Sequence, residues 1–237
     1  GQKFWNYIAD CPNAKKYIPD ITNTIKLLSK TNAKQVHLMA YSCGSPLLAE
    51  ALTNLRQEFP EMNRDALQDK FRISNVSFVA SDISLQSFAR EYFPAIQDLS
   101  QQTVVYFSQK DGALKWSGIL AGSSRLGRPN PEDLSAEDLN RLASAPSLTS
   151  IDVSAVEGAH EMGGMTGHGY WYANDEISTD ILTSLWATVP PAERCLAPKD
   201  KANTWYFPEG YTECLAKKLI NIAPDIAVPA KNVLSKD

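Results

Sequence analysis

Four short apolar runs along the chain are typical of strands that are buried on both faces. They span residues 35–41, 76–80, 103–107 and 149–154. Their apolar character is nearly continuous instead of alternating, which indicates parallel strands covered by helices on both sides.

Segments with helical periodicity separate these runs. Apolar residues fall three or four positions apart at Ile21, Ile25 and Leu28 before the first run. Further apolar faces lie at residues 47–55 after the first run and at residues 85–92 after the second. Residues 113–120 follow the third run, and a last face lies near residues 177–185, where Asn174 is the expected N-cap. Strand and helix therefore alternate, which predicts an α/β fold with a doubly wound, mostly parallel sheet.

The pattern changes near residue 190. Residues 1–189 are expected to form the α/β core, and residues 190–237, rich in Pro and Lys, are expected to wrap around it with one helix near residues 213–222.

Composition removes several classes of function. The chain has 237 residues, with 23 Lys and Arg against 27 Asp and Glu, and no basic stripe of the kind that nucleic-acid binding needs. No apolar run approaches the ~18 residues of a membrane span. No signal peptide is visible and the chain opens without Met, so we interpret it as a mature or trimmed product.

The four cysteines give a conditional prediction about location. Cys195 and Cys214 flank a loop-like stretch, and a disulfide between them would favour an exported protein. The alternative is two free thiols in a cytosolic enzyme. Cys11 and Cys43 are interpreted as buried and inert.

The most informative stretch is residues 36–48, where an apolar strand runs into Ala40-Tyr41-Ser42-Cys43-Gly44 and a helix follows at once. This is the strand–turn–helix context of a nucleophile elbow, with Ala in place of the first Gly of G-x-S-x-G. The tight turn explains small residues at Ala40 and Gly44. It lifts the Ser42 hydroxyl above the sheet and aims the Cys43 N–H at a developing oxyanion.

A serine nucleophile needs a base, and two histidines are candidates. His160 and His168 lie in a Gly-rich loop, residues 157–170, after the fourth apolar run, whereas His37 lies inside the first. We favour His168, which sits between two glycines just before the last helix, and keep His160 as the alternative. The loop has no H-E-x-x-H spacing, so no metal site and no cofactor are expected.

The base in turn needs a carboxylate to orient it. Asp111 follows the third apolar run and Asp82 follows the second. The order Ser42, Asp111, His168 favours Asp111, and Asp82 is the alternative acid.

Several short collinear motifs now define a resemblance. Together with the elbow they are Ser81-Asp82-Ile83, Tyr106 to Leu114, Gly122 to Gly127, Ile151 to Ser154 and Gly167 to Tyr170. Over roughly residues 5–185 the chain resembles a bacterial α/β-hydrolase family of unknown function. The resemblance implies the α/β-hydrolase fold and a Ser42–Asp111–His168 triad, and it supplies no substrate.

Compared with that fold, the chain lacks strands before its elbow strand. The 34 residues before Gln35 suggest a loop and one helix, and they contain no Gly after Gly1 and no His, so the usual loop that supplies a second oxyanion donor is missing. The elbow strand would therefore lie at an aggregation-prone edge. We expect a second polypeptide or a missing N-terminal segment to complete the sheet.

These features predict a serine hydrolase that cleaves a small carboxylic ester through an acyl-enzyme. Tyr41, Tyr170 and Trp171 are candidate walls of the substrate pocket, although aromatic residues at such places equally belong to the core. The competing hypothesis is a catalytically inactive hydrolase-like domain that binds a protein or lipid partner.

Overall fold

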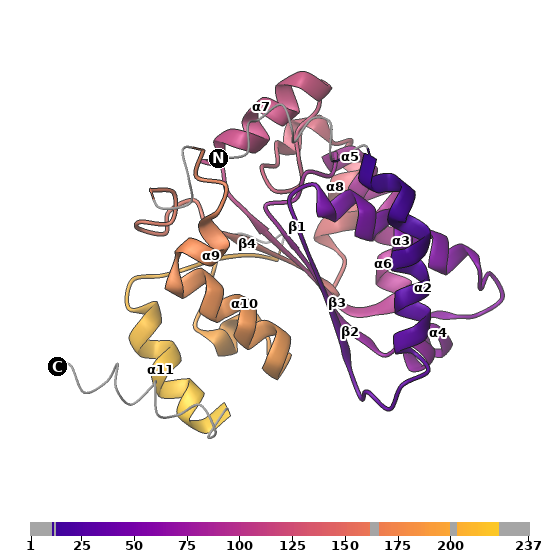
Figure 1. Cartoon of the computed structure of the whole chain (residues 1–237). Helices are drawn as coiled ribbons and strands as arrows, with labels where there is room; N and C mark the ends of the chain where they lie inside the picture. Colours follow the sequence, from indigo (N-terminus) through magenta and orange to yellow (C-terminus); the bar gives the residue numbers. More distant parts are fainter. Residues whose placement is uncertain (1–10, 12, 162–165, 200–202, 223–237) are drawn as a thin grey trace.

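The strands expected from the apolar runs form one sheet. A computed structural model describes residues 11, 13–161, 166–199 and 203–222. Within these residues the sheet has six strands in the order β1-β2-β3-β4-β6-β5, all parallel except β5 (Figure 1). The first four are β1 (Val36–Tyr41), β2 (Ile73–Val79), β3 (Ser100–Phe107) and β4 (Leu148–Asp152). The expected α/β class with a mostly parallel sheet is confirmed.

Two further strands come from the segment that was expected only to wrap around the core. They are β5 (Ala197–Pro198) and β6 (Thr204–Tyr206), and β6 pairs in parallel with β4. These strands are too short to produce an apolar run, and β5 contains a proline, so the sequence pattern did not reveal them. The division at residue 189 stays a prediction, but part of the C-terminal segment belongs to the sheet.

Helices cover both faces of the sheet (Figure 1). On one side lie α2 (Ile18–Leu28), α3 (Gly44–Gln57), α4 (Arg64–Phe71), α6 (Phe93–Leu99) and α8 (Ala136–Ala143). On the other lie α9 (Tyr170–Ala173), α10 (Asp175–Ala187) and α11 (Tyr211–Ile222). Between β2 and α6 come α5 (Leu85–Ser87) and the π-helix η2 (Phe88–Tyr92). Asn174 caps α10 as expected, since its side chain accepts the Ile177 N–H.

One helix stands apart from both layers. α7 (Gly112–Ala121) lies above the carboxyl ends of the strands, at the top of Figure 1. Short 3₁₀ turns complete the order, η1 (Lys15–Tyr17), η3 (Pro131–Asp133) and η4 (Pro191–Arg194). No helix among the described residues is long and apolar enough to cross a bilayer.

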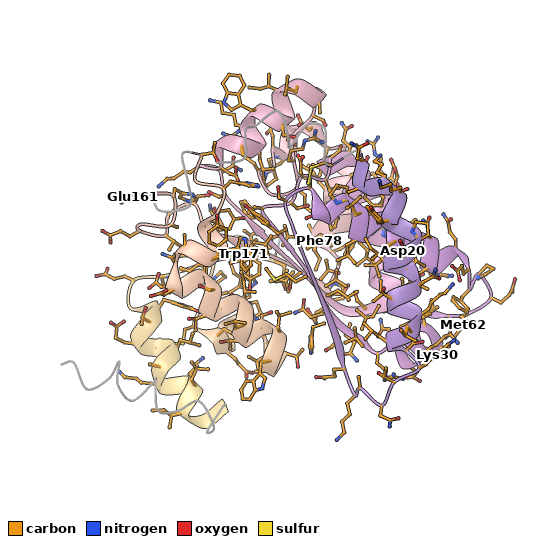
Figure 2. The ribbon with its side chains drawn as sticks, in the orientation of Figure 1. Asp20, Lys30, Met62, Phe78, Glu161 and Trp171 are labelled. Atoms are coloured by element: carbon orange, nitrogen blue, oxygen red, sulfur yellow. A yellow bond between two sulfur atoms is a disulfide. The ribbon has the colours of Figure 1, made fainter. Side chains whose placement is uncertain are left out.

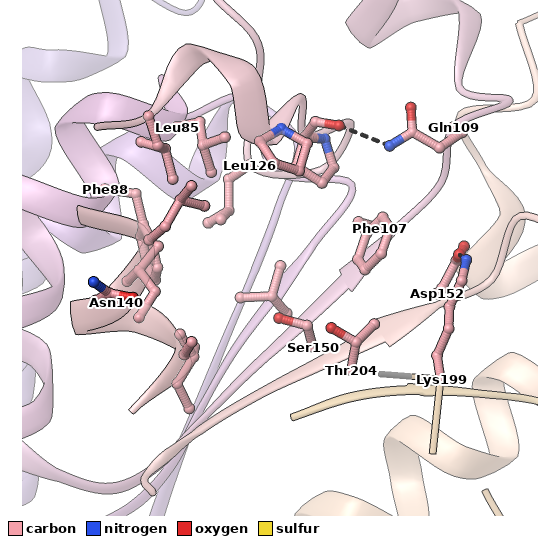
Figure 3. A pocket seen from close by; sticks show the side chains of 18 residues that line it. Leu85, Phe88, Phe107, Gln109, Leu126, Asn140, Ser150, Asp152, Lys199 and Thr204 are labelled. Carbon is pink, nitrogen blue, oxygen red and sulfur yellow. Dashed lines mark hydrogen bonds and ion pairs between the residues drawn. The ribbon is translucent and has the colours of Figure 1, made fainter. Parts of the chain in front are cut away.

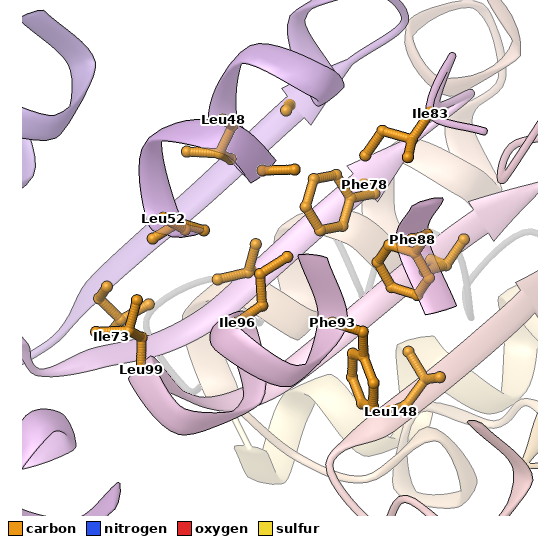
Figure 4. Packing of buried hydrophobic residues seen from close by; sticks show 14 of the residues in the cluster. Leu48, Leu52, Ile73, Phe78, Ile83, Phe88, Phe93, Ile96, Leu99 and Leu148 are labelled. Atoms are coloured by element: carbon orange, nitrogen blue, oxygen red, sulfur yellow. The ribbon is translucent and has the colours of Figure 1, made fainter. Parts of the chain in front are cut away.

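Side chains on the two faces of the sheet form two apolar clusters. Phe78 and Phe88 pack with α3 and α6 in the cluster drawn in Figure 4. The second cluster contains Tyr106 and Ile181 and packs against Trp171, which Figure 2 shows beside α9. Because both faces are buried, the strands carry the continuous apolar runs seen in the sequence.

The elbow strand occupies one edge of the sheet. In the part of the chain that the structure describes, β1 is hydrogen-bonded to one strand, β2. The edge position agrees with expectation, whereas the second polypeptide or preceding segment that would cover this edge stays a prediction.

All four cysteines are paired in two disulfides. Cys195–Cys214 is formed as the sequence suggested, and it joins the end of η4 to α11. The interpretation of Cys11 and Cys43 as inert thiols is wrong, because they are bonded to each other. The sequence separation of 32 positions between them hid this contact from the sequence. Disulfides are typical of proteins from oxidising compartments.

Candidate active site

The turn after β1 holds Ser42 in a strained conformation. Its φ is 53°, in the left-handed region that non-glycine residues rarely adopt. The strain is held by backbone hydrogen bonds: the Ser42 N–H donates to the Val79 carbonyl, and the Ser42 carbonyl accepts from Asp82 and Ser45. The neighbouring strand and the first turn of α3 therefore fix the elbow in place.

One expected reason for this sequence is wrong. A Cβ on Gly44 would meet no atom within 4 Å, so the turn has room for a side chain at this position and does not require glycine. The crowded glycine is Gly127, where a Cβ would lie 2.3 Å from the Ser81 nitrogen. The Gly122–Gly127 motif thus allows close backbone packing next to the elbow.

Three side chains that are distant in sequence meet above the sheet. His168 Nε2 lies 2.7 Å from Ser42 Oγ, and His168 Nδ1 lies 2.6 Å from Asp111 Oδ2. With the Nδ1 proton donated to the carboxylate, Nε2 is left to accept the serine proton. This is the arrangement in which an imidazole can act as a general base.

Asp111 has a rigid position. Its side chain is fully buried and accepts the Leu114 N–H, so the residue is also the N-cap of α7. The first turn of α7 is fixed further by the Gly112 N–H, which donates to the Thr166 carbonyl two residues before His168. One helix start thus orients both the acid and the histidine loop.

The two alternative residues have other partners. His160 lies 3.1 Å from Ser108 Oγ through Nε2 and 3.3 Å from the Gly167 carbonyl through Nδ1, so it supports the loop that carries His168. Asp82 accepts a hydrogen bond from Ser117 and forms an ion pair with Arg125.

Cys43, the residue after the serine, combines a backbone N–H donor with a disulfide bond. Among the residues that the structure describes, no acceptor takes the Cys43 N–H, which lies at the N-terminus of α3. A helix N-terminus favours developing negative charge. The Cys11–Cys43 disulfide links this donor to the beginning of the described chain, a constraint that the sequence did not indicate beyond its even number of cysteines.

The aromatic candidates divide into two groups. Tyr41 donates from its hydroxyl to the His168 carbonyl, and its ring lies 5.0 Å from the His168 ring and 5.7 Å from the Trp171 ring. Burial, with Tyr172 and Asp111 nearby, raises the pKa of Tyr41 well above its ordinary value, so it stays a neutral donor. Tyr170 is fully buried and bridges Ala80 and Tyr106, so it belongs to the core and not to an open pocket.

Access to the serine is narrow. Ser42 is 6% exposed. A cavity of about 450 Å³ lies over β3, β4 and β6, and Figure 3 shows Phe107, Ser150 and Thr204 along it. A second cavity of about 310 Å³ lies closer to the triad, where Gly167, Gly112 and Trp116 line it.

No cluster of three or more His, Cys, Asp or Glu side chains suited to a metal ion occurs within the described ranges.

Comparison with known protein families agrees with the fold. The model of a family described as alpha/beta hydrolase of unknown function (DUF900) matches residues 1–185. The match covers more than half of the 237 residues, and the chain belongs to this family. No curated protein and no solved structure matches the chain.

Proposed function

We propose that this α/β-hydrolase is a serine hydrolase that cleaves a carboxylic ester through an acyl-enzyme. The observation that carries the proposal is the pair of short contacts on one imidazole, 2.7 Å to Ser42 Oγ and 2.6 Å to Asp111 Oδ2. A histidine held between a buried carboxylate and a strained serine is arranged to move a proton.

The reaction proceeds in two halves. His168 Nε2 takes the Ser42 proton as Oγ attacks the ester carbonyl, and the imidazolium then protonates the leaving alcohol. Water, deprotonated by the same Nε2, attacks the acyl-serine, and the acid leaves as Ser42 recovers its proton. Asp111 keeps Nδ1 protonated and stabilises the imidazolium in both halves.

The Cys43 N–H is the first oxyanion donor in this mechanism. It is unused in the described structure and stands at the start of α3, where the helix dipole adds to its effect. We assign a second donor to another polypeptide or to a segment that precedes β1. We assign to the same source a strand that pairs with the edge of β1 where no described residue pairs with it. We assign Tyr41 and Trp171, whose ring centroids lie 5.7 Å apart, to the wall of the substrate pocket.

The second candidate is a hydrolase-like domain that binds a protein or lipid and does no chemistry. The low exposure of Ser42 favours it. The triad geometry opposes it, since a binding role does not require an acid, a base and a strained alcohol in line. The two disulfides favour an exported protein under either function.

Hydrolysis of short p-nitrophenyl esters separates the two functions. We expect turnover by the parent protein and its loss in Ser42→Ala and in His168→Ala. His160→Ala distinguishes the two candidate bases, since it removes the other loop histidine. Loss of turnover in His160→Ala with retention in His168→Ala would overturn the assignment, as would a folded parent protein without turnover.

A further inference from the structure

The outward face of α7 is a patch of large apolar side chains. Trp116, Ile119 and Leu120 are 59%, 61% and 67% exposed. They are spaced i, i+3, i+4, so they lie together on one side of the helix. Soluble proteins seldom leave such a contiguous patch in water without a use for it.

This exposure is not the result of a loosely held helix. The inner side of α7 is anchored at its start by the Asp111 cap and by buried Leu114 in the first turn. Ser117 Oγ donates to Asp82, and Gly118 packs near the Ser123 carbonyl. The helix is therefore fixed, with its apolar side turned outward.

The exposed charges of α7 and of the two residues before it have one sign. Lys115 is the one charged residue within α7, Lys110 precedes the helix, and both side chains are exposed. Trp favours the boundary between water and acyl chains, and lysine is attracted to anionic headgroups. The helix also lies at the top of the molecule, apart from the two helical layers (Figure 1).

The patch adjoins the triad. α7 begins next to Asp111, and Trp116 lines the 310 Å³ cavity together with Gly167, the residue before His168. We propose that α7 docks the protein on an anionic lipid surface through Trp116, Ile119, Leu120 and the two lysines. The substrate of Ser42 is then a lipid ester presented at that surface, a conclusion that rests on the proposed function.

Binding is tested first, without chemistry. The Ser42→Ala protein is sedimented with phosphatidylcholine vesicles that contain or lack phosphatidylglycerol. We expect binding to the anionic vesicles, reduced at least about tenfold when Trp116, Ile119 and Leu120 are all changed to Ser. Lys115→Glu is expected to weaken binding in the same direction and changes no apolar contact.

A control comes from α10, on another side of the molecule. Leu182 and Trp186 are 65% and 54% exposed, so their change to Ser removes exposed apolar surface of the same kind, one Leu and one Trp. Vesicle binding is expected to survive in this variant. Equal loss in the two sets, no binding by the parent, or an α7 patch that instead holds two copies together in sedimentation would each overturn the proposal.

Labelling by a fluorophosphonate in solution separates this inference from the proposed function. A parent that is labelled at Ser42 but ignores vesicles keeps its hydrolase assignment and loses the docking surface. A Ser42→Ala protein that binds vesicles, from a parent that is never labelled, keeps the docking surface and loses the hydrolase assignment.

Discussion

Two aspartates, Asp111 and Asp180, are fully buried in this molecule, and their partners differ in kind. Asp111 is paired with His168, an imidazole that is partly exposed and contacts Ser42. Asp180 is paired with the buried guanidinium of Arg194 and accepts hydrogen bonds from two tyrosines, Tyr106 and Tyr211.

The proposed mechanism gives Asp111 a role in proton transfer, whereas the partners of Asp180 give it a structural role. An imidazole gains and loses a proton near neutral pH, whereas a guanidinium stays charged. Burial opposes the charge on Arg194, but Asp180 raises the pKa of that guanidinium above its ordinary value. The Asp180 cluster thus joins β3, α10, η4 and α11, and attaches the C-terminal segment to the sheet.

The largest expected effect is the loss of kcat when Asp111 is changed. Asp111→Asn keeps an oxygen that can cap α7 but removes the charge that orients and stabilises protonated His168. We expect kcat for ester hydrolysis to fall about 10⁴-fold, with little change in thermal stability. A kcat within a few-fold of the parent would show that Asp111 is a structural cap alone.

The matching substitution at the second buried aspartate is Asp180→Asn. It leaves Arg194 buried without its counter-charge, so the free energy of unfolding is expected to drop by about 3–5 kcal/mol. Urea unfolding followed by circular dichroism measures this. The folded fraction should keep the parent kcat, and a large loss of kcat at full stability would break the distinction between the two aspartates.

The Cys195–Cys214 disulfide is also expected to contribute to stability and not to kcat. It joins two residues that are 19 positions apart in sequence, next to the Asp180 cluster, and its removal by changing both cysteines to Ala is expected to cost about 3 kcal/mol of stability. Calorimetry of the double variant tests this.

Removal of Cys11–Cys43 should additionally lower kcat, because that bond tethers the proposed oxyanion donor.

Alkaline pH is expected to lower the stability of the folded state through its buried tyrosines. Burial raises the pKa of Tyr106 and Tyr211, with Asp180 adding to the effect, and burial also raises that of Tyr170. Unfolded tyrosines lose their protons near pH ~10. Above that pH the folded state holds more protons than the unfolded state, so stability is fully present below it and falls as pH rises.

A Tm series from neutral pH to beyond pH ~10 follows this loss. Tyr211→Phe should flatten the alkaline decline. A Tm that is independent of pH in this range would contradict the burial of these phenols.

The sequence predicted those parts of the fold whose pattern depends on residues that are close together in the chain. The runs of β1 to β4 and the elbow were predicted because continuous burial and a tight turn constrain neighbouring residues. By contrast, α4 was missed because only Leu67 and Phe71 are buried on an otherwise polar helix. Short β6 was missed because its place depends on pairing with β4.

The site divides in the same way. Ser42, Asp111 and His168 each follow a strand, so parallel topology brought them to one edge and made their meeting predictable. The Cys11–Cys43 bond and the Asp180–Arg194 pair depend on how distant segments pack, and no local pattern in the sequence marks them.

Site mapping of a fluorophosphonate adduct is the most direct measurement of whether the serine in the strained turn is a nucleophile. Mass spectrometry of the digested, labelled protein should find the phosphonate on Ser42. The adduct should be absent from Ser42→Ala and form far more slowly in His168→Ala. A folded protein that stays unlabelled, or carries the adduct on another serine, would contradict the account.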